Sequence, residues 1–159
     1  MGFREVGSLI AGAVGVAPPK DNYSFVAQAA IKKGAAIKFR ADGKVNKAVN
    51  VDADTVAIAL EAAAADTDEI RGQFVVPGQI LKCPMTKKDG TAAAATDIHS
   101  DIKVGRTDLE MNDDGTGADV ETDPGTVTGP LLLISMDTDK MEALVVFTSG
   151  ALWNTKDST

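Results

Sequence analysis

The residues best placed for chemistry lie in the acidic second half of the chain. Glu110, Asn112 and Asp114 alternate with other residues, Gly115 follows them, and Glu121 comes six residues later. This spacing reproduces positions 1, 3, 5, 6 and 12 of a calcium-binding loop, with Glu in place of the usual Asp at position 1 and Gly in place of the usual apolar residue at position 8. Neither flank shows helical periodicity. The spacing predicts a calcium-dependent binding module as an alternative function.

Other catalytic chemistry has few residues to use. His99 is the only histidine and Cys83 the only cysteine, so one chain alone supplies neither a multi-histidine metal site nor a disulfide. Cys83 precedes a proline in an apolar run, which is typical of a small buried thiol. His99 is expected to be a loop residue that faces solvent. No Gly-x-Ser-x-Gly elbow, Walker loop or dinucleotide fingerprint occurs, so we expect no enzyme, with one built on His99 left as a rival.

Composition and charge limit the classes of partner. The chain has 159 residues, about one domain with one core, and aromatic residues make up only 4% of it. The net charge of −7 argues against general binding of nucleic acid or of anionic lipid. Up to Lys88 there are 12 Lys/Arg and 9 Asp/Glu, a net of +3, whereas from Asp89 onward there are 4 and 14, a net of −10. We expect these basic and acidic parts either to be solvated or to meet different partners.

The elements that must position these residues are strands. Ile37 and Phe39 alternate with charged residues, Asp42-Gly43 supplies a tight turn, and Val49 and Val51 alternate again with polar residues. Period-two alternation puts Phe39 on the core side of its strand. The same reasoning predicts strands at 35–41, 55–61, 70–76, 79–85, 131–136 and 144–147, the last two as a terminal hairpin buried on both faces. The expected fold is mainly β.

Two segments flank or interrupt this pattern. Residues 1–22 are rich in Gly and Ala and end in Pro-Pro, which predicts an extended N-terminal arm, with secretion as a minor alternative. Residues 23–159 are expected to form one β-rich domain. Within it, 89–129 form an acidic, turn-rich loop region punctuated by four Gly-containing turns. No apolar stretch is long enough to span a membrane, so no membrane association is expected.

The strand pattern between residues 25 and 85 resembles that of a known family. The segments Ile31-Lys32-Lys33-Gly34, Asp42-Gly43-Lys44-Val45, Val56-Ala57-Ile58-Ala59-Leu60-Glu61-Ala62 and Ile70-Arg71-Gly72-Gln73-Phe74-Val75-Val76 carry it. In turn spacing and apolar pattern they look like the capsid decoration (cement, head-stabilising) proteins of tailed phages. The resemblance implies a small β-barrel or β-tulip-like domain, often trimeric, on the outer surface of an icosahedral capsid.

That resemblance also implies partners and contact residues. The chain would bind subunits of the major capsid protein and stabilise the shell against internal DNA pressure, with no direct contact to nucleic acid and no cofactor apart from the possible calcium. The N-terminal arm would complete the contact by adding to capsid strands. The expected contact residues are Phe3, Leu9, Ile10, Val14, Val16 and Trp153, with Phe25 and Phe39 as further candidates.

Overall fold

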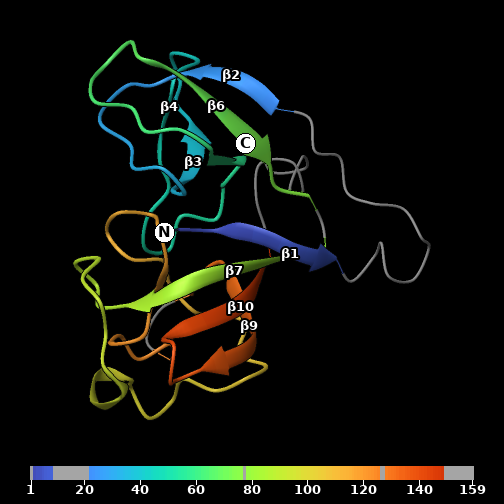
Figure 1. Ribbon diagram of the computed structural model, residues 1–159, viewed down its shortest axis with the longest axis vertical. Coiled ribbons are helices and arrows are strands. Elements are labelled where there is room, and N and C mark those ends of the chain that lie inside the picture. Colours follow the sequence, from blue (N-terminus) through green and yellow to red (C-terminus); the bar gives the residue numbers. More distant parts are fainter. Residues whose placement is uncertain (1, 9–21, 77, 126–127, 149–159) are drawn as a thin grey trace.

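The computed structural model describes residues 2–8, 22–76, 78–125 and 128–148, and these form two sheets that lie one above the other in Figure 1. The lower sheet, sheet A, contains β1 (Arg4–Ser8), β7 (Gln79–Thr86), β10 (Glu142–Phe147) and β9 (Leu131–Asp137) in that order, and the short β8 (Ala118–Asp119) pairs with β7. The upper sheet, sheet B, has the order β2 (Asn22–Val26), β6 (Glu69–Phe74), β5 (Ala57–Ala59), β3 (Ala36–Phe39) and β4 (Val45–Lys47). The prediction of a mainly β chain is confirmed.

Helical structure is nearly absent from the described part of the chain. Its single helical element is one 3-10 turn, η1 (Ala95–Asp97), in which the Asp97 carboxylate accepts a hydrogen bond from the Ala94 N–H at 2.8 Å. Within the described residues, no helix is long and apolar enough to cross a membrane.

The predicted hairpin around Asp42-Gly43 is confirmed. β3 and β4 pair antiparallel, with Phe39 opposite Val45. Gly43 adopts a φ of +82°, a conformation that costs glycine little and other residues more. The alternation predicted at Val49 and Val51 is wrong, because residues 49–52 turn back: the Asp52 N–H donates to the Val49 carbonyl at 2.9 Å.

Sheet B is strongly curled but is not closed into a barrel. Its first and last strands meet through one isolated bridge, the parallel pair Ala27–Val45, beside which the Gln28 N–H donates to the Val45 carbonyl at 2.8 Å. One residue pair does not make a continuous ladder, so β2 remains an edge strand along Asn22–Val26. The expected closed barrel is therefore corrected to two antiparallel sheets.

Sheet A is built on the terminal hairpin. β9 and β10 pair antiparallel from Glu142–Asp137 to Phe147–Leu131, as predicted. β9 alternates between buried and more exposed residues, so this strand is covered on one face and not on both. The segment Arg4–Ser8, which the sequence analysis assigned to an arm, forms β1 and pairs antiparallel with β7.

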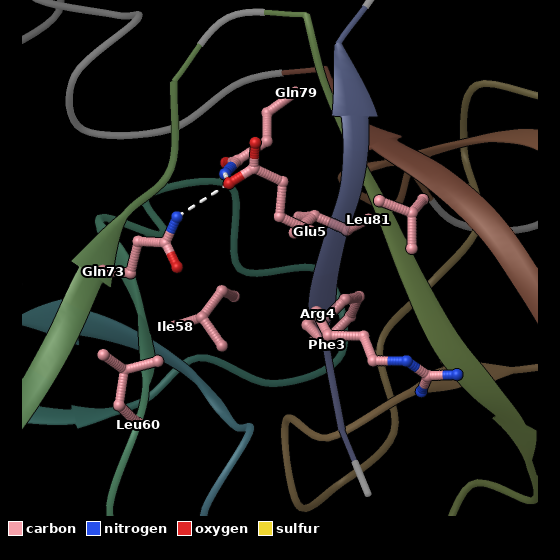
Figure 2. A pocket seen from close by; sticks show the side chains of 9 residues that line it. Phe3, Arg4, Glu5, Ile58, Leu60, Gln73, Gln79 and Leu81 are labelled. Carbon is pink, nitrogen blue, oxygen red and sulfur yellow. Dashed lines mark hydrogen bonds between the residues drawn. The ribbon is translucent and has the colours of Figure 1, made fainter. Parts of the chain in front are cut away.

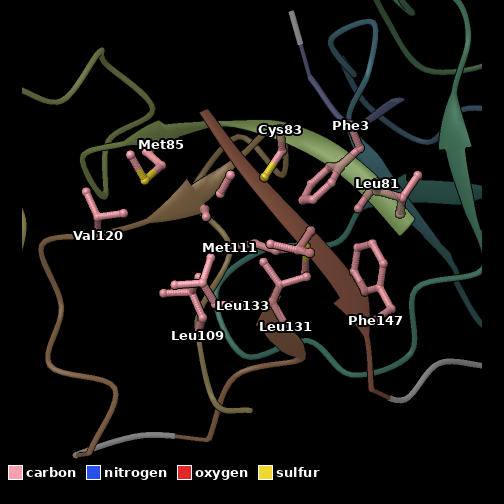
Figure 3. Close-up of a cluster of buried hydrophobic side chains, with 14 of the residues drawn as sticks. Phe3, Leu81, Cys83, Met85, Leu109, Met111, Val120, Leu131, Leu133 and Phe147 are labelled. Carbon is pink, nitrogen blue, oxygen red and sulfur yellow. The ribbon is translucent and has the colours of Figure 1, made fainter. Parts of the chain in front are cut away.

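The buried side chains form two clusters, where the chain length suggested one core. The smaller cluster fills the concave side of sheet B, with Phe25, Ile37 and Ile70 among its members. The larger cluster, drawn in Figure 3, lies under sheet A and reaches Ala36 and Ile58 of sheet B.

The acidic region contributes much of the larger cluster. Leu109, Met111 and Val120 are buried there against β7, β9 and β10. The described residues between 89 and 129 are turn-rich, as predicted, and they cover the core of sheet A. The apolar side chains that stand between the acidic residues of this region, such as Leu109, Met111 and Val120, are the ones that pack into the larger cluster.

Candidate functional site

Four aromatic side chains gather at the edge of sheet B. The ring centroids of Tyr23 and Phe74 lie 4.6 Å apart, those of Phe25 and Phe74 5.7 Å apart, and those of Phe25 and Phe39 5.8 Å apart. These separations are those of favourable tilted and edge-to-face aromatic pairs. We call this set of four residues the aromatic edge.

Strand geometry explains the gathering. Tyr23 and Phe25 are two residues apart on β2 and therefore lie on the same face. In the register of β2 and β6, Tyr23 is opposite Gly72 and Phe25 is opposite Ile70. Because Gly72 has no side chain, the ring of Phe25 occupies the space above the neighbouring strand, where it also reaches Phe74.

The aromatic edge is buried at its base and exposed at its rim. Phe25 is 7% exposed, whereas Tyr23 is 50% and Phe39 48% exposed. The prediction that alternation buries Phe39 is wrong, because β3 ends at this residue and the exposed turn 40–43 follows it. The chain has few aromatic residues, yet Tyr23 and Phe39 are both about half exposed to solvent. Phe39 packs on the buried Phe25, and Tyr23 packs on Phe74.

This arrangement is suited to docking a protein surface. Tyrosine and phenylalanine are enriched at the centres of protein interfaces, where they bury a large area with little loss of side-chain entropy. Among the described strands β2 pairs only with β6, so the other side of its backbone presents N–H and C=O groups that another strand can pair with. The aromatic edge therefore combines an apolar anchor with a strand edge.

The predicted calcium-loop residue Asn112 serves a structural role. Asn112 is fully buried, and its side-chain oxygen accepts the N–H groups of Asp114 at 3.1 Å and Thr116 at 3.0 Å. Its amide nitrogen donates to the hydroxyls of Thr86 at 2.8 Å and Thr116 at 3.3 Å. The oxygen that a cation would need is already used by the turn.

The three carboxylates of the predicted loop do not converge on one point: two have different partners, and the third is buried. Asp114 pairs with Lys32 at 2.9 Å, and Glu121 accepts the Lys88 backbone N–H at 3.0 Å. Glu110 is 4% exposed, and no hydrogen-bond partner reaches its Oε2 in the described part of the chain. Burial raises the pKa of Glu110 above its ordinary value, and the nearby charges of Asp119 and Asp113 act in the same direction. This geometry does not favour a calcium loop.

A different group of potential metal ligands surrounds His99. Ligand atoms of His99, Asp101 and Asp123 all lie within 4.8 Å of one another, an arrangement that the sequence spacing did not reveal. The Nδ1 atom of His99 accepts the Asp101 N–H at 3.1 Å, and Asp123 accepts the Gly125 N–H at 2.8 Å. Arg106 is close enough for its charge to interact with both aspartates. A cation would compete with this guanidinium and with existing hydrogen bonds, so we assign no metal site here.

The prediction that Cys83 is buried is confirmed. Its side chain is fully buried in the larger cluster, and burial raises the pKa of the thiol to about 12. Such a thiol carries almost no thiolate near neutral pH, and the thiolate is the nucleophilic form.

Lysine side chains of β3 and of the turn that follows it pair with acidic neighbours. Lys38 pairs with Asp52 at 2.8 Å, and Lys44 pairs with Asp66 at 2.8 Å. The side-chain hydrogen bond from Lys44 lowers the pKa of Asp66 below its ordinary value. These two lysines are thus partly exposed and ion-paired within the chain.

The predicted contact residues divide into two groups. Phe3 is buried in the larger cluster, where its ring centroid lies 5.3 Å from that of Phe147, so it supports the fold (Figure 3). Leu9, Ile10, Val14, Val16 and Trp153 lie outside the described residues.

Tyr23 was missed at the sequence level, although its i, i+2 spacing with Phe25 at the start of a strand was a usable signal. No protein-family model and no curated protein sequence matches the chain. Function is therefore inferred from the geometry of the aromatic edge and from the pattern resemblance of residues 25–85.

Proposed function

We propose that the chain is a non-enzymatic structural protein that decorates and stabilises an icosahedral phage capsid by binding subunits of the major capsid protein. The observation that supports this function best is the aromatic edge. It is an exposed apolar anchor, with Tyr23 and Phe39 about half exposed, on a strand edge that has room for a partner. The resemblance of residues 25–85 to capsid decoration proteins suggests that the partner is a major capsid protein.

The proposed mechanism has two parts. Burial of the Tyr23 and Phe39 rings against a capsid subunit supplies affinity, and pairing of a capsid strand with β2 fixes orientation. A homotrimer of the chain would then present three such edges at a local threefold position of the outer capsid surface. Binding through three edges at once turns weak contacts into strong avidity without any new kind of contact.

The chemistry of the nucleophiles and acids supports a binding role over catalysis. The Cys83 thiol is buried with a raised pKa, and the Nδ1 of His99 is engaged by a backbone N–H. Several surface carboxylates are tied to cations, as in the bond from the Arg4 guanidinium to Glu142 at 2.6 Å. None of these groups is prepared to act on a substrate.

The test is co-sedimentation with empty tailed-phage capsids that lack their own decoration protein, combined with light-scattering mass of the free chain. We expect a trimer that binds shells, and a loss of binding in Tyr23→Ala/Phe39→Ala. The control is Val104→Ala, which removes another exposed apolar side chain, 60% exposed, from a loop of the acidic region. A monomer that ignores capsids, or equal binding by the double variant, contradicts the proposal.

A further inference from the structure

A groove of about 460 Å³ opens between β1 of sheet A and strands β5 and β6 of sheet B (Figure 2). Its apolar wall is formed by Phe3, Ile58, Leu60 and Leu81. Its polar side is formed by Glu5, Gln73 and Gln79. The groove is separate from the aromatic edge, so a ligand bound in it does not depend on the proposed function.

The polar side of the groove is organised around one carboxylate. The side-chain amide of Gln73 donates to Glu5 Oε2 at 2.8 Å, and that of Gln79 donates to the same oxygen at 3.2 Å. Gln79 is buried, and its own oxygen accepts the Val76 N–H at 3.4 Å. Two amides from two different strands thus fix the position of the Glu5 carboxylate.

These hydrogen bonds leave acceptor oxygens facing the groove. Both amide donors are directed to Oε2 of Glu5, so its second oxygen remains an acceptor, and Figure 2 shows the Gln73 carbonyl oxygen directed towards the space beside Ile58. The neighbouring Arg4 does not neutralise this group, because it extends to the other side of β1, where it pairs with Glu142. A carboxylate next to an amide carbonyl is a recognition site for a cationic donor, and a planar guanidinium suits it best.

The backbone of β1 offers a second element of recognition. The Phe3 N–H donates to the Gly34 carbonyl at 2.9 Å, which shows that the edge of β1 away from β7 faces sheet B. Backbone groups alternate along a strand, so the N–H and C=O of Glu5 point to the same side as those of Phe3. Among the described strands β1 pairs only with β7, and this edge is therefore available to an extended peptide.

We propose that the groove binds an extended polypeptide segment of a partner protein that places one arginine side chain against Glu5. The guanidinium would bond to the second carboxylate oxygen of Glu5 and to the carbonyl of Gln73. The aliphatic stem would lie on Ile58 and Leu60, as the methylenes of arginine commonly do on apolar surface. The peptide backbone would pair with the open edge of β1 at Glu5.

The probe is the blocked pentapeptide acetyl-Thr-Val-Arg-Val-Thr-amide, titrated into the 15N-labelled full chain and followed by amide chemical shifts. We expect shifts concentrated on β1, β5 and β6. A matching peptide with citrulline for arginine keeps the shape and removes the charge, and N-acetyl-arginine amide keeps the side chain and removes the strand. Both are expected to bind at least about tenfold more weakly, the ratio that 1.4 kcal/mol of lost interaction produces.

Variants locate the site. Glu5→Gln is expected to weaken the arginine peptide by about tenfold and to leave the citrulline peptide unchanged. Glu69→Gln, which makes the same change of charge on the exposed side of β6, is the matched control and should bind as the parent does. If Glu5→Gln folds poorly, Gln73→Leu tests the same site, and it should also weaken binding of the arginine peptide. Equal binding of both peptides, equal binding by Glu5→Gln and Gln73→Leu, or shifts confined to another surface would overturn the proposal.

Discussion

The ring of Phe25 lies directly against the backbone of Gly72 on the adjacent strand. A Cβ atom built on Gly72 would be 2.8 Å from Cε2 of Phe25 and 3.4 Å from Cδ1 of Ile37. The first separation is too short for any real side chain, so this glycine is required for space and not for an unusual backbone angle. The contact fixes the base of the aromatic edge, on which Phe39 and Phe74 pack in turn.

We predict that Gly72→Ala lowers the free energy of unfolding by about 1–3 kcal/mol, the usual cost of adding a methyl group to a filled core. The reason is displacement of the Phe25 ring by the new Cβ. Urea denaturation followed by circular dichroism measures it. In the double variant Gly72→Ala/Phe25→Leu the two effects should be less than additive, because the smaller side chain leaves room for the methyl group. Strict additivity would show that the two residues do not contact each other as described.

Asn112 provides a second prediction. Asn112→Ala removes four hydrogen bonds from a buried turn and leaves the Asp114 and Thr116 N–H groups without that acceptor. We expect a loss of about 2–3 kcal/mol in unfolding free energy, since buried donors that lose their partner carry their desolvation cost. Thermal unfolding by calorimetry is the measurement. The exposed Asp113→Ala, one residue away, is the control, and a similar loss in both variants would contradict this role.

Calcium is expected to have little effect on stability. A cation that binds the folded chain raises its melting temperature by mass action, but here Asn112 and Asp114 are already engaged, by backbone N–H groups and by Lys32. The melting temperature in about 5 mM CaCl₂, roughly five times the weakest dissociation constants of extracellular calcium modules, should equal that in EDTA to within about 1 °C. A rise of several degrees that disappears in Asp114→Asn/Glu121→Gln would restore the calcium-dependent module as the leading function.

The strands were predictable from the sequence because their burial follows a simple period. The alternation in Ile70 to Phe74 and the apolar runs of the terminal hairpin correspond to β6, β9 and β10. Phe39 shows where the period fails: alternation assigns a face, but the end of the strand decides whether anything covers that face. Its side chain therefore lies in the exposed part of the aromatic edge.

Sequence patterns do not predict sites that are formed by residues far apart in the chain. Glu5 meets Gln79 because β1 pairs with β7 in sheet A, and it meets Gln73 because this part of sheet A lies against β6 of sheet B; no spacing in the sequence signals either approach. The calcium motif illustrates a different limit. Its spacing was correct, but the loop turns Asn112 inward to satisfy its own backbone, and a spacing rule does not specify that orientation.

Cys83 should be unreactive in the folded chain. With a pKa raised to about 12 and no exposed surface, it should react with a thiol reagent such as DTNB at pH 8 roughly 100-fold or more slowly than free cysteine does. Absorbance at the wavelength of the released thiolate follows the reaction. Addition of denaturant should restore the rate of an unfolded thiol. Rapid labelling under native conditions would show that the strand β7 opens far more readily than its packing implies.

Glu110 makes the stability depend on pH in a direction opposite to that of a salt-bridged acid. Burial raises its pKa in the folded chain, so the folded state binds the proton more tightly than the unfolded state does. Below its ordinary pKa of 4.5 the group is protonated in both states, and the cost of a buried charge is absent. As the pH rises through that value towards the raised folded pKa, the unfolded state ionises first and stability is lost. Lys88 opposes this effect, whereas Asp119 and Asp113 increase it.

Glu110→Gln should therefore stabilise the chain at neutral pH, because the amide carries no charge that burial disfavours. The gain should shrink towards zero as the pH falls below 4.5, because both proteins are then uncharged at this position. Melting temperatures of the two proteins from pH 3.5 to pH 8 measure the difference, with Glu69→Gln on an exposed strand position as the control whose difference stays flat. A gain that is constant with pH would mean that the substitution acts through packing. A loss at neutral pH would mean that the Glu110 carboxylate has a stabilising partner and that its isolation under the acidic region is incorrect.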